Sequence, residues 1–244
     1  MQQYARSLPI LDASEQPLPT VEALDRLWTE VNQKPLWAPP RFFKYLKLRW
    51  RSRLKLLDPA RLNLSMPPGK VNDCSTCTDI CCIGPRSTVL LRLRDIATLK
   101  DIGRSDLITQ RKPHFSAEEL NARPALRRQI TSRGWDTFPV LKQNTFGACG
   151  ALSVSGKCLV YPHWPLACAR FPFSLHLEAE EIFYSQRCQS FWIRNDSGAK
   201  VSEMAIAAVA SYNERIKDLV LLAYAPEQLA DLGLMKYLSL HPLG

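Results

Sequence analysis

The stretch Cys74-Ser75-Thr76-Cys77-Thr78-Asp79-Ile80-Cys81-Cys82 holds four of the eight cysteines of this 244-residue chain. The two-residue gap between Cys74 and Cys77 lets a tight turn direct both sulfurs at one metal ion, as in zinc and iron–sulfur sites. Cys81 and Cys82 are adjacent, and neighbouring side chains diverge. This pair therefore indicates either one ligand with one supporting thiol or two nearby sites.

The other four cysteines follow at longer intervals, at Cys149, Cys158, Cys168 and Cys188. Each gap is long enough for a turn or short hairpin that returns to a common point, and Gly147 permits sharp backbone geometry beside a thiolate. Four plus four ligands fill either two tetrahedral sites or one cluster with spare thiols. We predict that all eight cysteines are metal ligands, with their division between sites left open.

Iron–sulfur is slightly favoured over zinc as the bound metal. An all-cysteine ligand set with an adjacent pair suits a polynuclear cluster, and a [4Fe–4S] cluster is the expected form. Disulfides are not expected, because the chain is expected to be cytoplasmic, where thiols stay reduced. His163 is the positional candidate for a nitrogen ligand, although all-cysteine ligation already suffices.

Charge and hydropathy add weaker constraints. The formal net charge is +9, but that sum counts every cysteine as neutral, whereas ligating thiols are deprotonated. Basic residues such as Arg86, Arg170 and Arg187, beside the cysteines, would then serve as local counter-charge. Met1–Gln16 lacks the pattern of a targeting signal. The longest apolar run, 219–225, is far shorter than the roughly 20 residues of a membrane span, so no transmembrane segment is expected.

We predict an α+β, mainly helical fold, with a small irregular β or knuckle core around the cysteine metal centre. Residues 1–71 form an N-terminal extension, 72–191 the cysteine-cluster metal-binding domain, and 192–244 a C-terminal helical region. In the extension, Val21–Asn32 is expected to be helical with Thr20 as its N-cap.

Arg41–Leu57 is expected to form a basic amphipathic helix, with an apolar stripe and lysines and arginines at the other positions. Such a helix could present the protein to a protein partner, to nucleic acid or to an anionic membrane surface. The competing interpretation is that the stripe packs on its own domain while the charges stay solvated.

Further elements follow from local patterns. The alternation in Ser87–Arg94 predicts a strand, after which Asp95 is the expected N-cap of a helix that ends at Gly103. The patterns also predict a helix over Ser116–Ser132, a long C-terminal helix over Ser202–Tyr224, and short strands or knuckles at Phe138–Lys142, Ala151–Val154, Leu159–Tyr161 and Phe173–Leu177.

The cysteine motifs, read in order, resemble those of a known family. Cys74-x-x-Cys77-x-x-x-Cys81-Cys82 is followed by Gly147-Ala148-Cys149, by Gly156-Lys157-Cys158-Leu159-Val160-Tyr161 and by Cys168-Ala169-Arg170-Phe171-Pro172-Phe173. This arrangement resembles the YkgJ-type cysteine-cluster family over about half the chain. The resemblance implies a zinc- or iron-chelating protein. Two departures are Trp164-Pro165 in place of the family's Arg-Pro, and Cys168-Ala169 in place of its Cys-Arg.

Two classes of function remain. The first is a metal-binding protein that acts as an accessory, assembly or structural factor, with another protein as its expected partner. The second, implied by the family's flagellin lysine N-methylases, is an enzyme that uses S-adenosylmethionine to methylate a protein lysine. The chain lacks a Gly-x-Gly-x-x-Gly fingerprint for a nucleotide-type site. We therefore favour the first class, and no catalytic residue is assigned.

Overall fold

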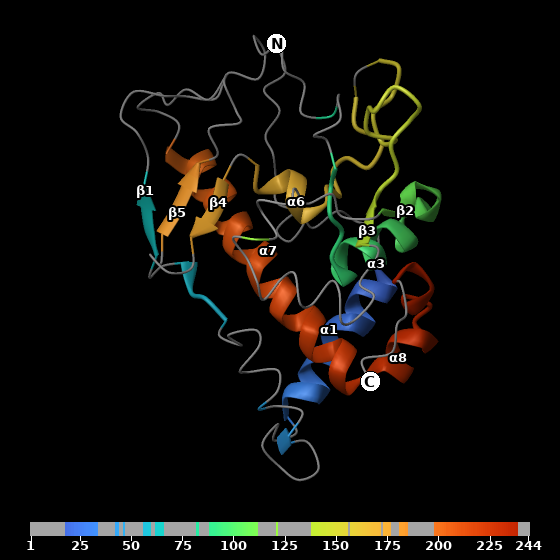
Figure 1. Ribbon diagram of the computed structural model, residues 1–244, viewed down its shortest axis with the longest axis vertical. Helices are drawn as coiled ribbons and strands as arrows, with labels where there is room; N and C mark the ends of the chain where they lie inside the picture. Colours follow the sequence, from blue (N-terminus) through green and yellow to red (C-terminus); the bar gives the residue numbers. More distant parts are fainter. Residues whose placement is uncertain are drawn as a thin grey trace.

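The computed structural model describes residues 18–33, 42–43, 46, 56–59, 62–65, 82, 88–111, 121, 138–155, 157–171, 173–176, 181–184 and 198–238. In these ranges the chain is mainly helical with a few short strands, which confirms the expected α+β class (Figure 1). The α-helices are α1 (Pro19–Gln33), α3 (Leu93–Asp101), α6 (Leu166–Ala169), α7 (Gly198–Tyr224) and α8 (Pro226–Asp231). The strands are β1 (Asn63–Ser65), β2 (Ile108–Arg111), β3 (Phe138–Leu141), β4 (Phe173–His176) and β5 (Glu181–Tyr184), and short 3₁₀ helices lie at Ser105–Leu107 and Met235–Tyr237.

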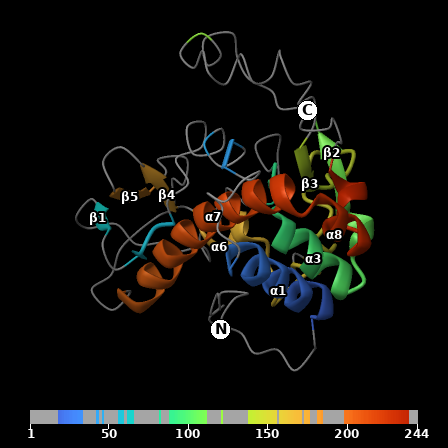
Figure 2. The ribbon, with the colours of Figure 1, turned by 90° about the horizontal axis from the view of Figure 1, so that it is seen from below.

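Helix α7 is the element on which both parts of the core are built. It runs from the strands β4 and β5 to α8, with α1 and α3 alongside it (Figures 1 and 2). Its first half packs the small residues Ala205 and Ala208 on Phe173 of β4 and Ile182 of β5. Since alanine has no side chain beyond Cβ, the sheet lies close to the helix backbone. Ala207 packs against Ala169 of α6 in the same way.

The second half of α7 closes the larger core cluster. Val220 and Leu221 are buried there with apolar residues of α1, α3 and α8. Cys149 belongs to the same cluster, and Cys82 and Cys158 pack against it. The cysteine-bearing loops therefore sit directly on the helical core. This core draws on all three of the sequence ranges 1–71, 72–191 and 192–244.

Two small sheets flank the helices. In the first, of order β1-β5-β4, β1 runs parallel to β5 with Asn63 opposite Glu181, and β4 and β5 are antiparallel with Phe173 opposite Tyr184. In the second, β2 and β3 are antiparallel. The expected strands at 138–142 and 173–177 are thus confirmed in shortened form, whereas residues 159–161 form a turn.

The expected strand over Ser87–Arg94 is reduced to an isolated bridge between Leu90 and Val140 in β3. The reason is that α3 begins at Leu93, two residues before the predicted N-cap. Asp95 instead lies inside the first turn, where its carboxylate accepts a hydrogen bond from the backbone N–H of Arg92 at 2.8 Å. The helix ends as expected, with Gly103 at a positive φ of 71°.

Helix α1 has a cap that the sequence alone did not indicate. It begins at Pro19, so Thr20 lies inside the helix and is not its N-cap. Asp101, at the end of α3, accepts hydrogen bonds from the backbone N–H groups of Thr20 and Val21 through one carboxylate oxygen, at 2.8 and 3.1 Å. A carboxylate from another helix therefore satisfies the donors that a helix N-terminus leaves free.

Only a few residues of the basic segment 41–57 are described. Phe42, Phe43 and Leu46 are helical, whereas Leu56 and Leu57 are not, so the expected helix does not reach its predicted end. The side-chain amide of Asn213 in α7 both donates to and accepts from the backbone of Leu57, each at 2.9 Å. This end of the segment is thus attached to α7.

The predicted helix over Ser116–Ser132 lies outside the described residues except for Asn121, which is helical. Helix α7 begins at Gly198, so Ser202 lies within it and is not the cap that starts it. None of the helices in the described ranges is long and apolar enough to cross a membrane.

A second carboxylate, half-buried on α7, contacts the start of α3. Asp218 of α7 accepts from the backbone N–H of Leu93 at 3.3 Å. The pKa of Asp218 is raised to about 8, mainly by burial and also by the charges of Glu214 and Asp95, while Arg92 and the hydrogen bond from Leu93 oppose the rise. Because the pKa of Asp218 in the folded chain exceeds the usual value of 3.8, the folded state binds a proton that the unfolded state releases.

We predict a pH dependence of stability that Asp218→Asn removes. At about pH 3 Asp218 is protonated in both the folded and the unfolded state. As the pH rises, the unfolded state loses this proton first, so the contribution of Asp218 to stability falls until the pH passes about 8. The unfolding free energy of the wild type should therefore fall relative to that of the variant by up to about 1.4 kcal/mol per pH unit between these limits. Urea unfolding of both proteins across this range measures the difference. If the unfolding free energy of the wild type instead increases relative to that of the variant as the pH rises, the raised pKa assigned to Asp218 is wrong.

Candidate metal centre

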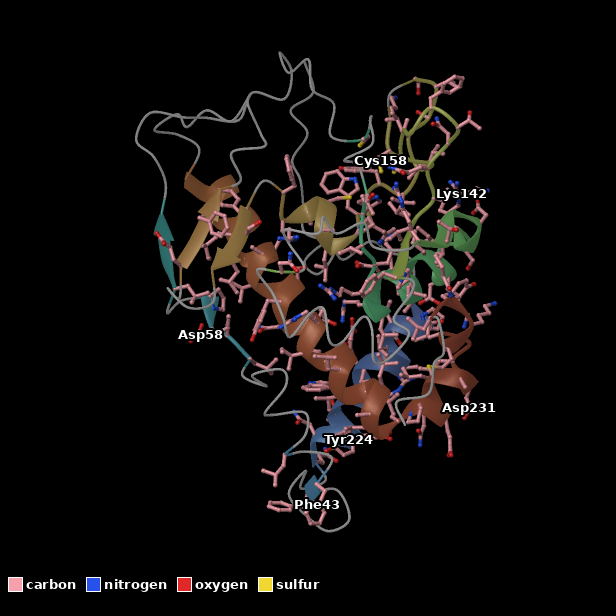
Figure 3. The ribbon with its side chains drawn as sticks, viewed as in Figure 1. Phe43, Asp58, Lys142, Cys158, Tyr224 and Asp231 are labelled. Carbon is pink, nitrogen blue, oxygen red and sulfur yellow. The ribbon has the colours of Figure 1, made fainter. Side chains whose placement is uncertain are left out.

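Four of the eight predicted ligands lie in the described part of the chain: Cys82, Cys149, Cys158 and Cys168, all as free thiols. The other four, Cys74, Cys77, Cys81 and Cys188, lie outside the described residues. The first three of the described set are brought together at the edge of the larger core cluster. Cys158 lies at the base of the loops that follow β3 (Figure 3).

Backbone hydrogen bonds hold these loops in place. The N–H of Cys149 donates to the carbonyl oxygen of Cys82 at 2.6 Å, so the two cysteine groups that the sequence separates meet directly. The loop after Cys149 then pairs with the next one, because Leu152 and Cys158 form an isolated antiparallel bridge. Cys158 therefore returns to the neighbourhood of Cys149, as the predicted hairpin requires.

Two glycines make the path of this loop possible. Gly147 has a positive φ of 76°, which side chains other than glycine rarely allow. Gly150 passes so close to the chain that a Cβ on it would lie 2.8 Å from the carbonyl oxygen of Lys142. The glycines on both sides of Cys149 thus allow the sharp backbone turns that the sequence predicts for this loop.

The four thiols influence one another electrostatically. Burial raises the pKa of Cys168 well above its ordinary value, and the charges of Cys149, Cys82 and Cys158 raise it further, in that order. Such effects act over a few ångströms. The charges of all three other thiols therefore act on Cys168, and it is the one whose ionised form most needs a counter-charge.

Cys149 carries a feature that favours a thiolate. Burial raises the pKa of its thiol, and the backbone amides of Ala151 and Leu152 oppose this rise. The Leu152 N–H also donates to the carbonyl oxygen of Cys149 at 3.0 Å, which holds the turn closed. Hydrogen bonds from amides two and three residues further on stabilise negative charge on sulfur. This part of the loop is thus arranged as a thiolate-stabilising turn.

Asp95 connects the helical core to the segment that carries Cys168. One oxygen of its buried carboxylate accepts from the backbone N–H of Arg92, the residue before α3, and the other accepts from the backbone N–H of Leu166, the first residue of α6, at 2.9 Å. Burial raises the pKa of Asp95 to about 6. Its local sequence pattern indicates a helix cap, but nothing in the sequence indicates the contact with α6, because 71 residues separate the partners.

Arg170 supplies positive charge beside Cys168. Its pKa is lowered by burial and by Arg92, and the charge of Cys168 acts in the opposite direction. One terminal nitrogen donates to the carbonyl oxygen of Phe173 at 3.3 Å, whereas the buried Nε has no acceptor within the described residues. A buried donor without an acceptor is costly. An anionic sulfur centre at this place would fit such a donor.

The thiols are neighbours, but they are not at ligand distances. Within the described ranges, no group of three or more histidine, cysteine, aspartate or glutamate side chains is arranged to hold a metal ion as it stands. Coordination by zinc requires sulfur within about 2.3 Å of the ion, whereas electrostatic coupling extends over roughly 4–6 Å. The arrangement therefore brings sulfur donors into one region without fixing a coordination geometry.

His163, the candidate nitrogen ligand, is buried in the turn between Cys158 and Cys168. It lines a hollow of about 390 Å³ with Arg104 and Tyr161. The residues whose charge acts on Cys168 are cysteines and Asp95. Ligation by His163 stays a prediction.

Comparisons of the chain with protein-family models, with curated proteins and with solved structures give no match. The resemblance to the YkgJ-type family thus rests on the order and spacing of the cysteine motifs and stays a prediction.

The double role of Asp95 leads to a prediction about individual backbone amides. Asp95→Ala should increase the hydrogen-exchange rates of the Arg92 and Leu166 amides by about fivefold or more, because each loses a hydrogen bond worth roughly 1 kcal/mol. Exchange of assigned amides, followed by nuclear magnetic resonance, measures this.

Asp101→Ala is the matched control, because its carboxylate accepts from Thr20 and Val21 instead. This variant should increase exchange at the start of α1 and leave Leu166 protected. If Asp95→Ala leaves Leu166 protected, or if Asp101→Ala exposes it equally, the proposed connection between α3 and α6 is wrong.

Proposed function

We propose that this chain is a metal-binding cysteine-cluster protein, an accessory, assembly or structural factor, in which Cys82, Cys149, Cys158 and Cys168 contribute to one thiolate centre. An iron–sulfur cluster is the preferred occupant and zinc the alternative. Cys74, Cys77, Cys81 and Cys188 are proposed as further ligands of this centre or of a second one. The observation that carries the proposal is that Cys82, Cys149 and Cys158 meet on the larger core cluster, joined by the hydrogen bond from Cys149 to Cys82 and by the bridge between Leu152 and Cys158. The charges of these three thiols also raise the pKa of Cys168.

Each described part of the site contributes a defined function to this proposal. Asp95 holds the first turn of α6, which carries Cys168, against α3. The amides of Ala151 and Leu152 stabilise negative charge on Cys149. The buried Nε of Arg170 offers a hydrogen bond to an anionic sulfur. A bound metal would supply the positive charge that keeps such closely spaced thiols ionised.

The charge pattern of the surrounding segment supports the same proposal. Between Thr137 and Leu177 the chain has no aspartate or glutamate, whereas it has Lys142, Lys157 and Arg170. Three of the eight cysteines lie in this segment. A segment without carboxylates avoids like-charge repulsion with ionised thiols, and its cations compensate their charge. Part of the net charge of +9 is thus explained as compensation within the protein.

The alternative function, S-adenosylmethionine-dependent methylation of a protein lysine, stays a prediction from the family resemblance. No group among the described residues favours it over the metal-binding function. The cytoplasmic location and a protein partner stay predictions as well.

Anaerobic purification followed by metal and sulfide analysis tests the proposal. We expect iron and acid-labile sulfide with visible absorption in the wild type, and loss of most of the metal in Cys168→Ser and Cys149→Ser. Stoichiometric zinc without visible absorption would keep the metal centre and reverse the preference for iron–sulfur.

Val160→Ala is the control for general destabilisation. Val160 is buried in the turn between Cys158 and Cys168, and its truncation should cost about 2 kcal/mol of stability while all thiols remain. This variant should keep its metal. If both cysteine variants retain wild-type metal content, or if Val160→Ala loses as much metal as they do, the ligand assignment fails.

A further inference from the structure

The loops after β3 present apolar side chains to solvent. The exposed fraction is 89% for Phe146, and Val154 is fully exposed, while Leu159 and Tyr161 are about half exposed. Single exposed apolar residues are common on protein surfaces. Here four large apolar side chains are exposed within 16 residues, in the segment that contains Cys149 and Cys158. Such a group of exposed apolar residues indicates a binding surface.

The turn that presents Phe146 is held firmly by hydrogen bonds. The side-chain oxygen of Asn144 accepts from the backbone N–H groups of Phe146 and Ala148, at 3.0 and 2.9 Å. The carbonyl oxygen of Asn144 accepts from Gly147 at 3.0 Å. Phe146 is therefore displayed from a closed turn in which it contributes little to the core, and such preorganisation favours binding because little order is lost on contact.

The turn that presents Val154 is built in the same way. The backbone N–H of Ser153 donates to the carbonyl oxygen of Lys157 at 2.8 Å, and the Ser153 hydroxyl accepts from the Lys157 N–H at 2.9 Å. The Ser153 and Ser155 hydroxyls lie 2.9 Å apart. A second apolar side chain thus stands at the tip of a second closed turn, next to the first along the chain.

Basic residues lie near both turns. Lys142 precedes the first turn, Lys157 closes the second, and Arg111 in β2 donates to the side chain of Gln143 at 2.6 Å. Lys142 lies at the base of the same loops as Cys158 (Figure 3). No ion pair among the described residues involves Lys142 or Lys157; the nearby carboxylate of Asp106, which Lys142 influences, is paired with Arg104.

We propose that the two turns that present Phe146 and Val154 form a docking surface for an anionic membrane. Phe146 and Val154 would enter the interfacial layer, and Lys142, Lys157 and Arg111 would contact the lipid head groups. The residues between the two tips, 147–153, are all buried or half-buried, so Phe146 and Val154 reach solvent as two separate apolar points. A protein interface would instead need a contiguous apolar centre. This surface is distinct from the basic segment 41–57, and the proposal does not depend on metal binding.

Co-sedimentation of the full chain with vesicles of phosphatidylcholine, with and without phosphatidylglycerol, tests the proposal. We expect binding to the anionic vesicles that decreases as salt is added. Lys142→Gln and Lys157→Gln should each lower the partition coefficient about fivefold, and Phe146→Ser combined with Val154→Ser should reduce it at least as strongly. Unchanged thermal unfolding confirms that the variants are folded.

Two matched variants locate the binding surface. Ile206, 41% exposed on α7, is an apolar residue outside the loops, and Ile206→Ser should leave binding unchanged. Phe43, in the basic segment 41–57, is 78% exposed, and Phe43→Ser should also leave it unchanged. The proposal is overturned if anionic vesicles do not bind, if Phe43→Ser abolishes binding while the loop variants keep it, or if the loops bind only an acidic protein.

Discussion

The carboxylate of Asp95 is the contact on which the arrangement of helices and cysteines depends. Each of its two oxygens accepts a hydrogen bond from a different helix start, at Arg92 before α3 and at Leu166 in α6. Asp218 from α7 completes the same junction by accepting from Leu93. Because a buried backbone N–H without an acceptor is costly, the three helices are fixed relative to one another at this point. Cys168 takes its position from that junction.

Helix α7 provides the surface on which the rest is assembled. Its alanines allow the strands β4 and β5 and the short α6 to approach the helix backbone closely, while its larger residues near the other end fill the core shared with α1, α3 and α8. The cysteine loops lie on that core through Cys149, so the helical core extends directly beneath the candidate centre. The cysteine-bearing loops of this protein therefore rest on a helical framework, in contrast to short zinc modules whose fold depends on the ion.

Charge is distributed to suit this arrangement. Carboxylates are concentrated at the buried helix junction, in Asp95, Asp218 and Glu214, with Arg92 among them. The cysteine-bearing segment from 137 to 177 has none, and its cations are free to compensate thiolates or to contact an anionic surface. Within that segment no carboxylate adds to the negative charge of the thiols, and Asp95 of α3 is the carboxylate whose charge acts on Cys168.

The sequence by itself determined the class of fold, the long C-terminal helix, the short strands at Phe138 and Phe173, and the cysteines as the residues of chemical interest. These follow from local periodicity, from glycine positions and from the chemistry of thiols. Only the tertiary structure decided that Asp101 caps α1, that Asp95 joins α3 to α6, and that Cys82 meets Cys149. Each of these contacts joins residues about 70 or more positions apart, and local patterns contain no information on which distant donor a carboxylate or a carbonyl will meet.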